Sequence, residues 1–243
     1  MRGIKVLVVG LAAVTLVSVS ALAQPLCPNF DPGEAINLGT PLADIYLVDQ
    51  GVPPGGDQAL NDLAGVLLTR RAPGAIFQRV GDVPAIINNV DGEFKRRGNR
   101  AVDVVIGARG APGSFTIGGQ VVGNDNKNEQ DLIKGLQGKI KSLWIIACSV
   151  AQGNVGVAFL QRLAQGLAVG AKQPVAVAGP TGDLFADAGK NQLLCSPKTC
   201  DYAVKGAGVP SLTEWGLIAL AVLLAGSLAF MIRRRLAPRP AGA

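Results

Sequence analysis

The chain contains no histidine among its 243 residues. Histidine is the side chain whose ordinary pKa lies nearest neutral pH, and it is also the commonest metal ligand in proteins. Its absence excludes a histidine general base, a histidine metal ligand and a pH switch built on imidazole. With only four cysteines as further soft ligands, no metal site is predicted, and no cofactor is expected.

Charge is also scarce, because Asp, Glu, Lys and Arg make up 16% of the chain. The formal net charge of +6 arises at the two ends, which hold six of the 23 Lys and Arg residues. The other 17 basic residues are balanced by 17 Asp and Glu. A neutral central region gives no electrostatic reason to bind DNA or RNA, so no nucleic-acid partner is expected.

Residues 1–23 have the three parts of a secretory signal peptide. Arg2 and Lys5 precede an apolar stretch, and the segment ends in Ala-Leu-Ala before Gln24. Signal peptidase accepts small residues at this spacing, so we predict cleavage between Ala23 and Gln24. An uncleaved anchor is the alternative, although the apolar stretch is short for a full membrane span.

The C-terminal segment contains a second apolar run. Residues 217–232 are uncharged and mostly apolar, and Trp215 and Gly216 extend the run. At about 1.5 Å per residue this helix just crosses a hydrocarbon core of roughly 30 Å. The basic residues that follow should stay in the cytoplasm and stop transfer: Arg233, Arg234 and Arg235. We therefore expect residues 24–209 outside the cytoplasm.

The residues before this run carry a resemblance to a sorting signal. In order, they are Val209, Pro210, Ser211, Leu212, Thr213, Glu214, Trp215 and Gly216. Together with the helix and the Arg cluster they resemble the IPTL-CTERM signal, a relative of the PEP-CTERM signals handled by exosortase-type enzymes in Gram-negative bacteria. Val209 and Ser211 stand where the name-giving signal has Ile and Thr.

This resemblance implies two partners besides the membrane, signal peptidase and an exosortase-like sorting enzyme. It also implies an inner-membrane-anchored precursor with its domain in the periplasm. Delivery to the cell surface or the extracellular matrix would follow, with the tail removed during sorting.

Between the ends, short apolar runs alternate with segments of helical periodicity. Strands are predicted at 45–48, 75–80, 102–106, 143–147 and 175–178, with a hairpin at 114–122. Helices are predicted at 57–71, 83–97, 128–139 and 154–167. Alternation of this kind is typical of an α/β fold with a mainly parallel sheet and helices on both faces.

The predicted organisation has one folded domain. A lead-in loop over 24–40 precedes an α/β domain over 41–194, and a Cys-containing linker over 195–208 follows it. The sorting signal with its transmembrane helix occupies 209–236, and a cytoplasmic tail occupies 237–243.

Two predicted strands run into turns of small residues. Residues 107–113 read Gly-Ala-Arg-Gly-Ala-Pro-Gly, and 147–153 read Ala-Cys-Ser-Val-Ala-Gln-Gly. Neither turn has the spacing of a Walker or Rossmann phosphate loop, which argues against nucleotide binding. Because the carboxyl ends of parallel strands meet at one edge of a sheet, both turns fall where sites usually form.

The two turns resemble those of caspase-like cysteine peptidases, and more closely those of a caspase-like domain of unknown function in large bacterial surface proteins. There the first turn often reads His-Gly-Ser-Pro-Gly before a hairpin rich in Leu and Gly, and the second reads Gly-Cys-Asn-Val-Ala. The matching residues here are Gly110, Pro112, Gly113, the hairpin at 115–119, Cys148, Val150, Ala151 and Gly153. The resemblance covers about residues 101–185 and implies a caspase-like fold with Cys148 as candidate nucleophile.

Arg109 stands at the position of the catalytic histidine in this resemblance. A nearby guanidinium favours a thiolate, but it is too weak an acid to donate a proton to the leaving amine. Loss of a general acid or base costs about 10²- to 10⁴-fold in rate. Two functions remain open, a noncatalytic envelope or surface protein with a vestigial Cys148, and a cysteine peptidase or autoprocessing enzyme that uses it.

The other cysteines, Cys27, Cys195 and Cys200, flank the predicted domain. The domain enters an oxidising compartment, where thiols tend to pair, so at least one disulfide among these three is expected. Cys195 and Cys200 can close a tight loop, or Cys27 can pair with either. The connectivity stays open at this point, and Cys148 is expected to keep a free thiol.

Overall fold

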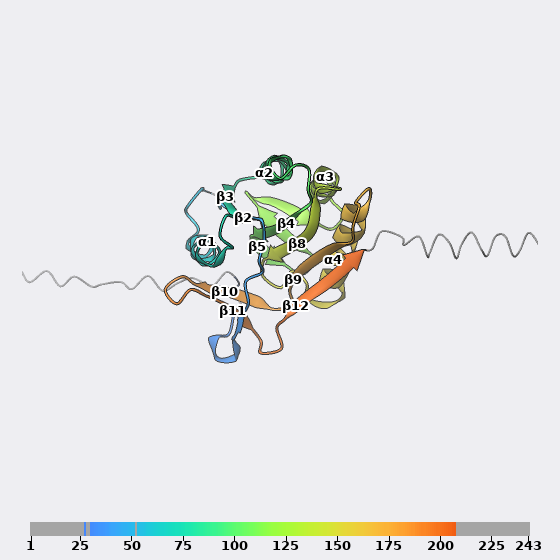
Figure 1. The fold of residues 1–243 in the computed structure, drawn as a ribbon. Coiled ribbons are helices and arrows are strands. Elements are labelled where there is room, and N and C mark those ends of the chain that lie inside the picture. Colours follow the sequence, from blue (N-terminus) through green and yellow to red (C-terminus); the bar gives the residue numbers. More distant parts are fainter. Residues whose placement is uncertain (1–26, 28–29, 52, 208–243) are drawn as a thin grey trace, which may run out of the picture.

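The computed structural model describes residues 27, 30–51 and 53–207. A six-stranded sheet forms its centre, in the order β12-β9-β8-β4-β2-β3 (Figure 1). Neighbouring strands are parallel except β12, which is antiparallel to β9. The strands are β2 (Ile45–Asp49), β3 (Ile76–Val80), β4 (Val102–Gly107), β8 (Ile140–Ile146), β9 (Val175–Pro180) and β12 (Tyr202–Ala207). The predicted mixed α/β fold with a mainly parallel sheet is confirmed.

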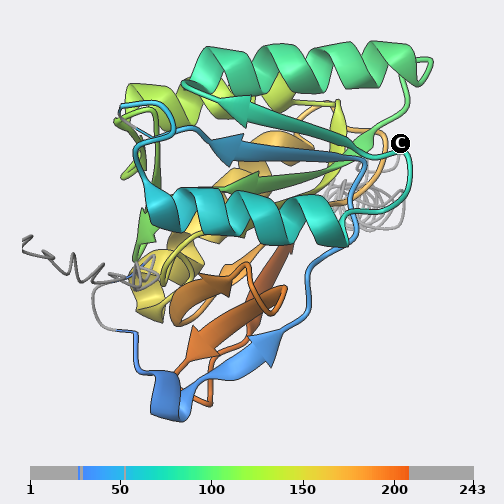
Figure 2. The ribbon, with the colours of Figure 1, turned by 90° about the vertical axis from the view of Figure 1, so that its left-hand side faces the viewer.

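Helices cover both faces of this sheet. Figure 2 shows the sheet between α2 on one side and α1 on the other. The helices are α1 (Gln58–Arg70), α2 (Val83–Arg96), α3 (Lys127–Leu136) and α4 (Gly153–Ala168). Three of them begin at an Asp or Asn whose side chain accepts a hydrogen bond from the first-turn backbone: Asp57 for α1, Asp82 for α2 and Asn126 for α3.

The hydrophobic core is divided by the central sheet into two clusters. Ile45 and Leu47 of β2 contribute to the cluster under α2, α3 and α4, whereas Tyr46 and Val48 contribute to the cluster under α1. This alternation follows from the two-residue period of a strand. Because both faces are covered, every residue of β2 is buried, which accounts for its continuous apolar sequence.

A second, three-stranded antiparallel sheet completes the layer that contains α1. Its order is β1-β11-β10, with β1 (Ile36–Leu38), β10 (Asp183–Asp187) and β11 (Gln192–Ser196). A short 3-10 helix, η1 (Pro32–Glu34), precedes β1. Figure 1 shows β10 and β11 beside α1. This small sheet is absent from the sequence-based prediction because β1 pairs with β11, a strand more than 150 residues further along the chain.

The predicted hairpin is confirmed as β6 (Ser114–Ile117) and β7 (Gln120–Gly123). A third strand, β5 (Arg109–Ala111), pairs with β6, so part of the first small-residue turn is extended.

Two segments expected to lack regular structure contain strands. The lead-in loop over 24–40 includes β1, and the linker over 195–208 includes the end of β11 and all of β12. β12 is an edge strand of the central sheet, so residues 202–207 are part of the fold rather than a linker. Within the described residues no helix is long and apolar enough to cross a membrane. The predicted signal peptide and the run at 217–232 lie outside those residues.

Candidate functional site

The two small-residue turns lie against each other at the carboxyl edge of the central sheet. Ala108 donates a backbone hydrogen bond to Ile146 (3.1 Å), and Gly113 donates one to Val150 (3.0 Å). A Cβ atom on Gly110 would lie 2.7 Å from that of Ala147, so only glycine fits here without displacement. The structure therefore brings together the two segments that the sequence singled out.

Cys148, the candidate nucleophile, forms a disulfide with Cys27. The two Cα atoms lie 5.8 Å apart, although 121 residues separate them in sequence. Both cysteines are buried, and the Leu184 amide of β10 donates to the Cys27 sulfur at 2.9 Å. The expectation of a free Cys148 thiol is therefore wrong. A sulfur in a disulfide carries no thiolate and cannot act as a nucleophile until it is reduced.

A second disulfide joins Cys195 and Cys200, with Cα atoms 6.0 Å apart. It closes the tight loop between β11 and β12, which was one of the alternatives open from sequence. Both cysteines belong to the core cluster under α1, together with Cys27 and Cys148. All four cysteines of the chain are thus paired.

Arg109, which the predicted caspase-like resemblance aligns with a catalytic histidine, forms an ion pair with Asp57. Its Nε lies 2.6 Å from Oδ2 and its second terminal nitrogen 2.9 Å from Oδ1. Asp57 is also the N-cap of α1 and accepts from the Leu60 amide at 3.2 Å. Burial alone would raise the pKa of the Asp57 carboxyl, but the hydrogen bonds from Arg109 and Leu60 outweigh it and lower the pKa below its ordinary value. Arg109 thereby ties the start of β5 to the start of α1.

Ser149, next to Cys148, is a residue that sequence reasoning missed. It is buried and has a left-handed backbone with φ of 48°, a rare conformation for a residue with a side chain. Its hydroxyl donates to Asp183 and its amide donates to the Gly182 carbonyl at 2.8 Å. These contacts fix the second turn to the start of β10. No sequence signal identifies them, because Asp183 lies 34 residues away.

Asp49 fixes the hairpin to the same edge of the sheet. It is the last residue of β2, and its Oδ1 accepts from the amides of Gly51 and Gly118, both at 3.0 Å. Only 3% of Asp49 is exposed, so these amides replace the water it loses on folding. Like Asp57 and Ser149, this polar group at the carboxyl edge is used in holding neighbouring segments together.

With both disulfides formed, the carboxyl edge of the central sheet offers no free thiolate within the described residues. The sulfur of Cys148 is oxidised, and the Arg109 guanidinium is held in an ion pair with Asp57. Across residues 27, 30–51 and 53–207, no group of three or more Cys, Asp or Glu is arranged to hold a metal ion.

Comparison with known proteins assigns one segment of the chain to a described family. The family described as the IPTL-CTERM motif matches residues 207–235. No curated protein and no solved structure matches the chain. The match begins at the last residue of β12 and contains the predicted signal from Val209 to Arg235, which lies outside the described residues.

The tail's resemblance to this family is therefore confirmed, whereas the caspase-like resemblance of the middle region stays a prediction. The motif implies processing by a sorting enzyme of the exosortase type and is consistent with export and membrane anchoring. The chain carries an IPTL-CTERM sorting signal directly after its folded α/β region.

Proposed function

We propose that this is an exported cell-envelope or surface protein, delivered by its C-terminal signal, whose caspase-like domain is noncatalytic. The observation that carries the proposal is the Cys27–Cys148 disulfide, which occupies the sulfur that a cysteine peptidase would need as its nucleophile. The sorting motif at 207–235 supports the delivery.

The surroundings of Cys148 support a structural role. Peptide hydrolysis needs a thiolate and then a proton donor for the leaving amine. Arg109 is paired with Asp57 at the start of α1, and a guanidinium is too weak an acid for the second task. The neighbouring Ser149 hydroxyl is bound to Asp183.

The disulfides also support export. Disulfides persist in oxidising compartments such as the periplasm and are rare in the cytosol. Signal-peptide cleavage after Ala23 would make Cys27 the fourth residue of the mature chain. The new N-terminus would then be tied to the carboxyl edge of the central sheet within a few residues of its end.

A cell-fractionation experiment on the full chain tests this function. The mature protein, with both disulfides intact, is expected in the envelope or on the surface. Deletion of the gene for the host's exosortase-like enzyme should leave a longer, membrane-bound precursor. Cytoplasmic protein with four free thiols would overturn the export.

The noncatalytic assignment is tested separately with peptide libraries and the purified protein. Turnover is expected neither before nor after mild reduction. Turnover that appears on reduction and disappears in Cys148→Ala would instead identify a cysteine peptidase held inactive by Cys27, the alternative reading of the same turn.

A further inference from the structure

A cavity of about 460 Å³ lies at the opposite, amino edge of the central sheet. It is bordered by the loops that lead into β4, β8 and β9. Five of the residues that line it carry the argument, and we call the cavity the amino-edge hollow: Phe94, Arg100, Lys141, Lys172 and Gln173. Its volume falls within the range of small-molecule sites.

The charge of the amino-edge hollow is one-sided. Three of its lining residues are Lys or Arg, and none is Asp or Glu. The region between the signal peptide and the C-terminal run is neutral as a whole, with 17 basic and 17 acidic residues. The one-sided lining of the hollow contrasts with this overall balance.

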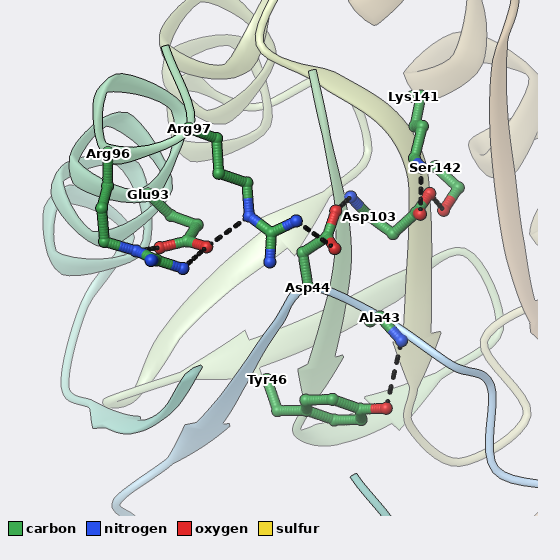
Figure 3. Close-up of polar contacts among 9 residues, drawn as sticks. All are labelled: Ala43, Asp44, Tyr46, Glu93, Arg96, Arg97, Asp103, Lys141 and Ser142. Atoms are coloured by element: carbon green, nitrogen blue, oxygen red, sulfur yellow. Dashed lines mark hydrogen bonds and ion pairs between the residues drawn. The ribbon is translucent and has the colours of Figure 1, made fainter. Parts of the chain in front are cut away.

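Neighbouring cations at the same edge are paired with carboxylates, as Figure 3 shows. Arg96 and Arg97 hold Glu93 at 2.6 and 2.5 Å, and Arg97 also reaches Asp44 at 2.8 Å. Within the hollow, Lys141 pairs with Asp103 at 2.7 Å. These pairs neutralise the cations that the fold uses for its own cohesion.

Arg100 and Lys172 differ from these neighbours. Both side chains are exposed, and neither has a carboxylate partner within the described part of the chain. Phe94, which is partly exposed, adds apolar surface beside them, and Gln173 adds an amide. A cavity that combines two uncompensated cations, an amide and apolar surface suits an anionic group attached to an apolar body.

The position of the hollow indicates where such a ligand would come from. β12 runs antiparallel to β9, and its last residue, Ala207, lies opposite Val175. Val175 follows two residues after Gln173, which lines the hollow. The chain therefore leaves the described fold at this same edge. The predicted membrane run begins with Trp215, and the eight residues up to it can span at most about 29 Å.

We propose that the amino-edge hollow binds the phosphate of an anionic phospholipid headgroup. Arg100 would hold the phosphate oxygens through its planar guanidinium, Lys172 would add a second charge, and Phe94 would contact the glycerol carbons. The proposal rests on the membrane-anchored precursor proposed above. Binding would hold the folded region against the membrane surface while the sorting signal is processed.

The test compares lipid binding by the full chain and by the double variant Arg100→Gln/Lys172→Gln. Native mass spectrometry from a neutral detergent counts phosphatidylglycerol and phosphatidylcholine bound to each protein. Arg233, Arg234 and Arg235 are the same in both proteins, so the difference isolates the hollow. Lys198→Gln is the matched control, because Lys198 is an exposed lysine in the loop between β11 and β12.

We expect the double variant to bind phosphatidylglycerol at least about tenfold more weakly, with phosphatidylcholine unchanged. The control should behave as the natural chain. An unchanged affinity for phosphatidylglycerol would overturn the site. Thermal destabilisation of the double variant without loss of lipid would also overturn it, and would assign both cations to the carboxyl ends of the nearby helices.

Binding of glycerol 3-phosphate distinguishes a soluble phosphate ester from a phospholipid headgroup as the ligand. If this ester binds the natural chain as tightly as phosphatidylglycerol does and loses affinity in the double variant, the headgroup assignment is wrong and the ligand is a free phosphate ester. Delivery to the envelope is measured separately by fractionation. Failure of lipid binding and failure of the proposed function therefore give different results.

Discussion

Cys27 and Cys148 join the first described residue of the chain to the carboxyl end of the fourth strand of the parallel array, across 121 residues. The bond places the N-terminal segment where the predicted peptidase-like site would lie. It also converts the most reactive residue type in the chain into a structural link. A cross-link of this span restricts the unfolded chain more than a short one does.

The two disulfides are expected to differ in their contribution to stability. Loop-closure entropy predicts about 5 kcal/mol for the pair separated by 121 residues and about 2 kcal/mol for the pair separated by five. Urea unfolding of Cys27→Ser/Cys148→Ser and Cys195→Ser/Cys200→Ser variants measures both. Equal losses of unfolding free energy in the two variants would contradict the dependence on loop length. Mass mapping under non-reducing conditions checks which cysteines are paired.

Introducing a histidine at position 109 is not expected to produce peptidase activity. Arg109→His supplies a general base, but Cys148 remains bound to Cys27, so no thiolate forms. The combination Cys27→Ser/Arg109→His frees the thiol and should react with an alkylating probe, still without turnover of peptide libraries. Turnover by this double variant that is lost on Cys148→Ala would contradict the noncatalytic assignment.

The ion pair between Asp57 and Arg109 should give a small pH dependence of stability. The pKa of Asp57 is lowered in the folded protein, so its contribution is present above the unfolded-state pKa of about 4 and is lost as pH falls through the folded-state value. Because Arg109 is partly exposed, we expect about 1 kcal/mol or less. Asp57→Asn keeps the helix cap and removes the charge, so its unfolding free energy should fall less between pH 5 and pH 3.

The contact between the two turns predicts opposite effects for two glycine substitutions. Gly110→Ala places a methyl group 2.8 Å from the Cys148 carbonyl oxygen and should destabilise the fold by about 1–3 kcal/mol. Gly92→Ala is the control, because Gly92 lies within α2 and nothing surrounds its Cβ position. It should stabilise the fold by about 0.5–1 kcal/mol through helix propensity. Unfolding midpoints of the two variants that move in the same direction would argue against the close packing at Gly110.

The topology of the precursor is tested with reporter insertions near Asp125, an exposed residue between β7 and α3. The basic residues at the two ends predict that this position lies outside the cytoplasm. A periplasm-dependent reporter should therefore be active there, and a cytoplasmic reporter should be silent. A fusion after Arg235 should give the reverse pattern.

The elements that could be read from sequence are those with a strong local period. The four helices and five parallel strands of the described residues agree with their predicted positions to within a few residues, because each segment carries its own hydrophobic pattern and three of the helices carry a local cap. The IPTL-CTERM tail is also determined locally, since its order of Pro, Leu, Trp-Gly, apolar run and Arg cluster is continuous in the chain.

The features that depend on distant pairs emerged only from the three-dimensional arrangement. β1 pairs with β11, Cys27 finds Cys148 rather than Cys195 or Cys200, and Ser149 meets Asp183. Each of these contacts joins residues far apart in sequence, and a local pattern cannot record such a placement. The order of strands and turns along the chain was enough to predict which turns would meet at the carboxyl edge. The path of the N-terminal segment beside β10 determined that Cys148 would be bonded there instead of free.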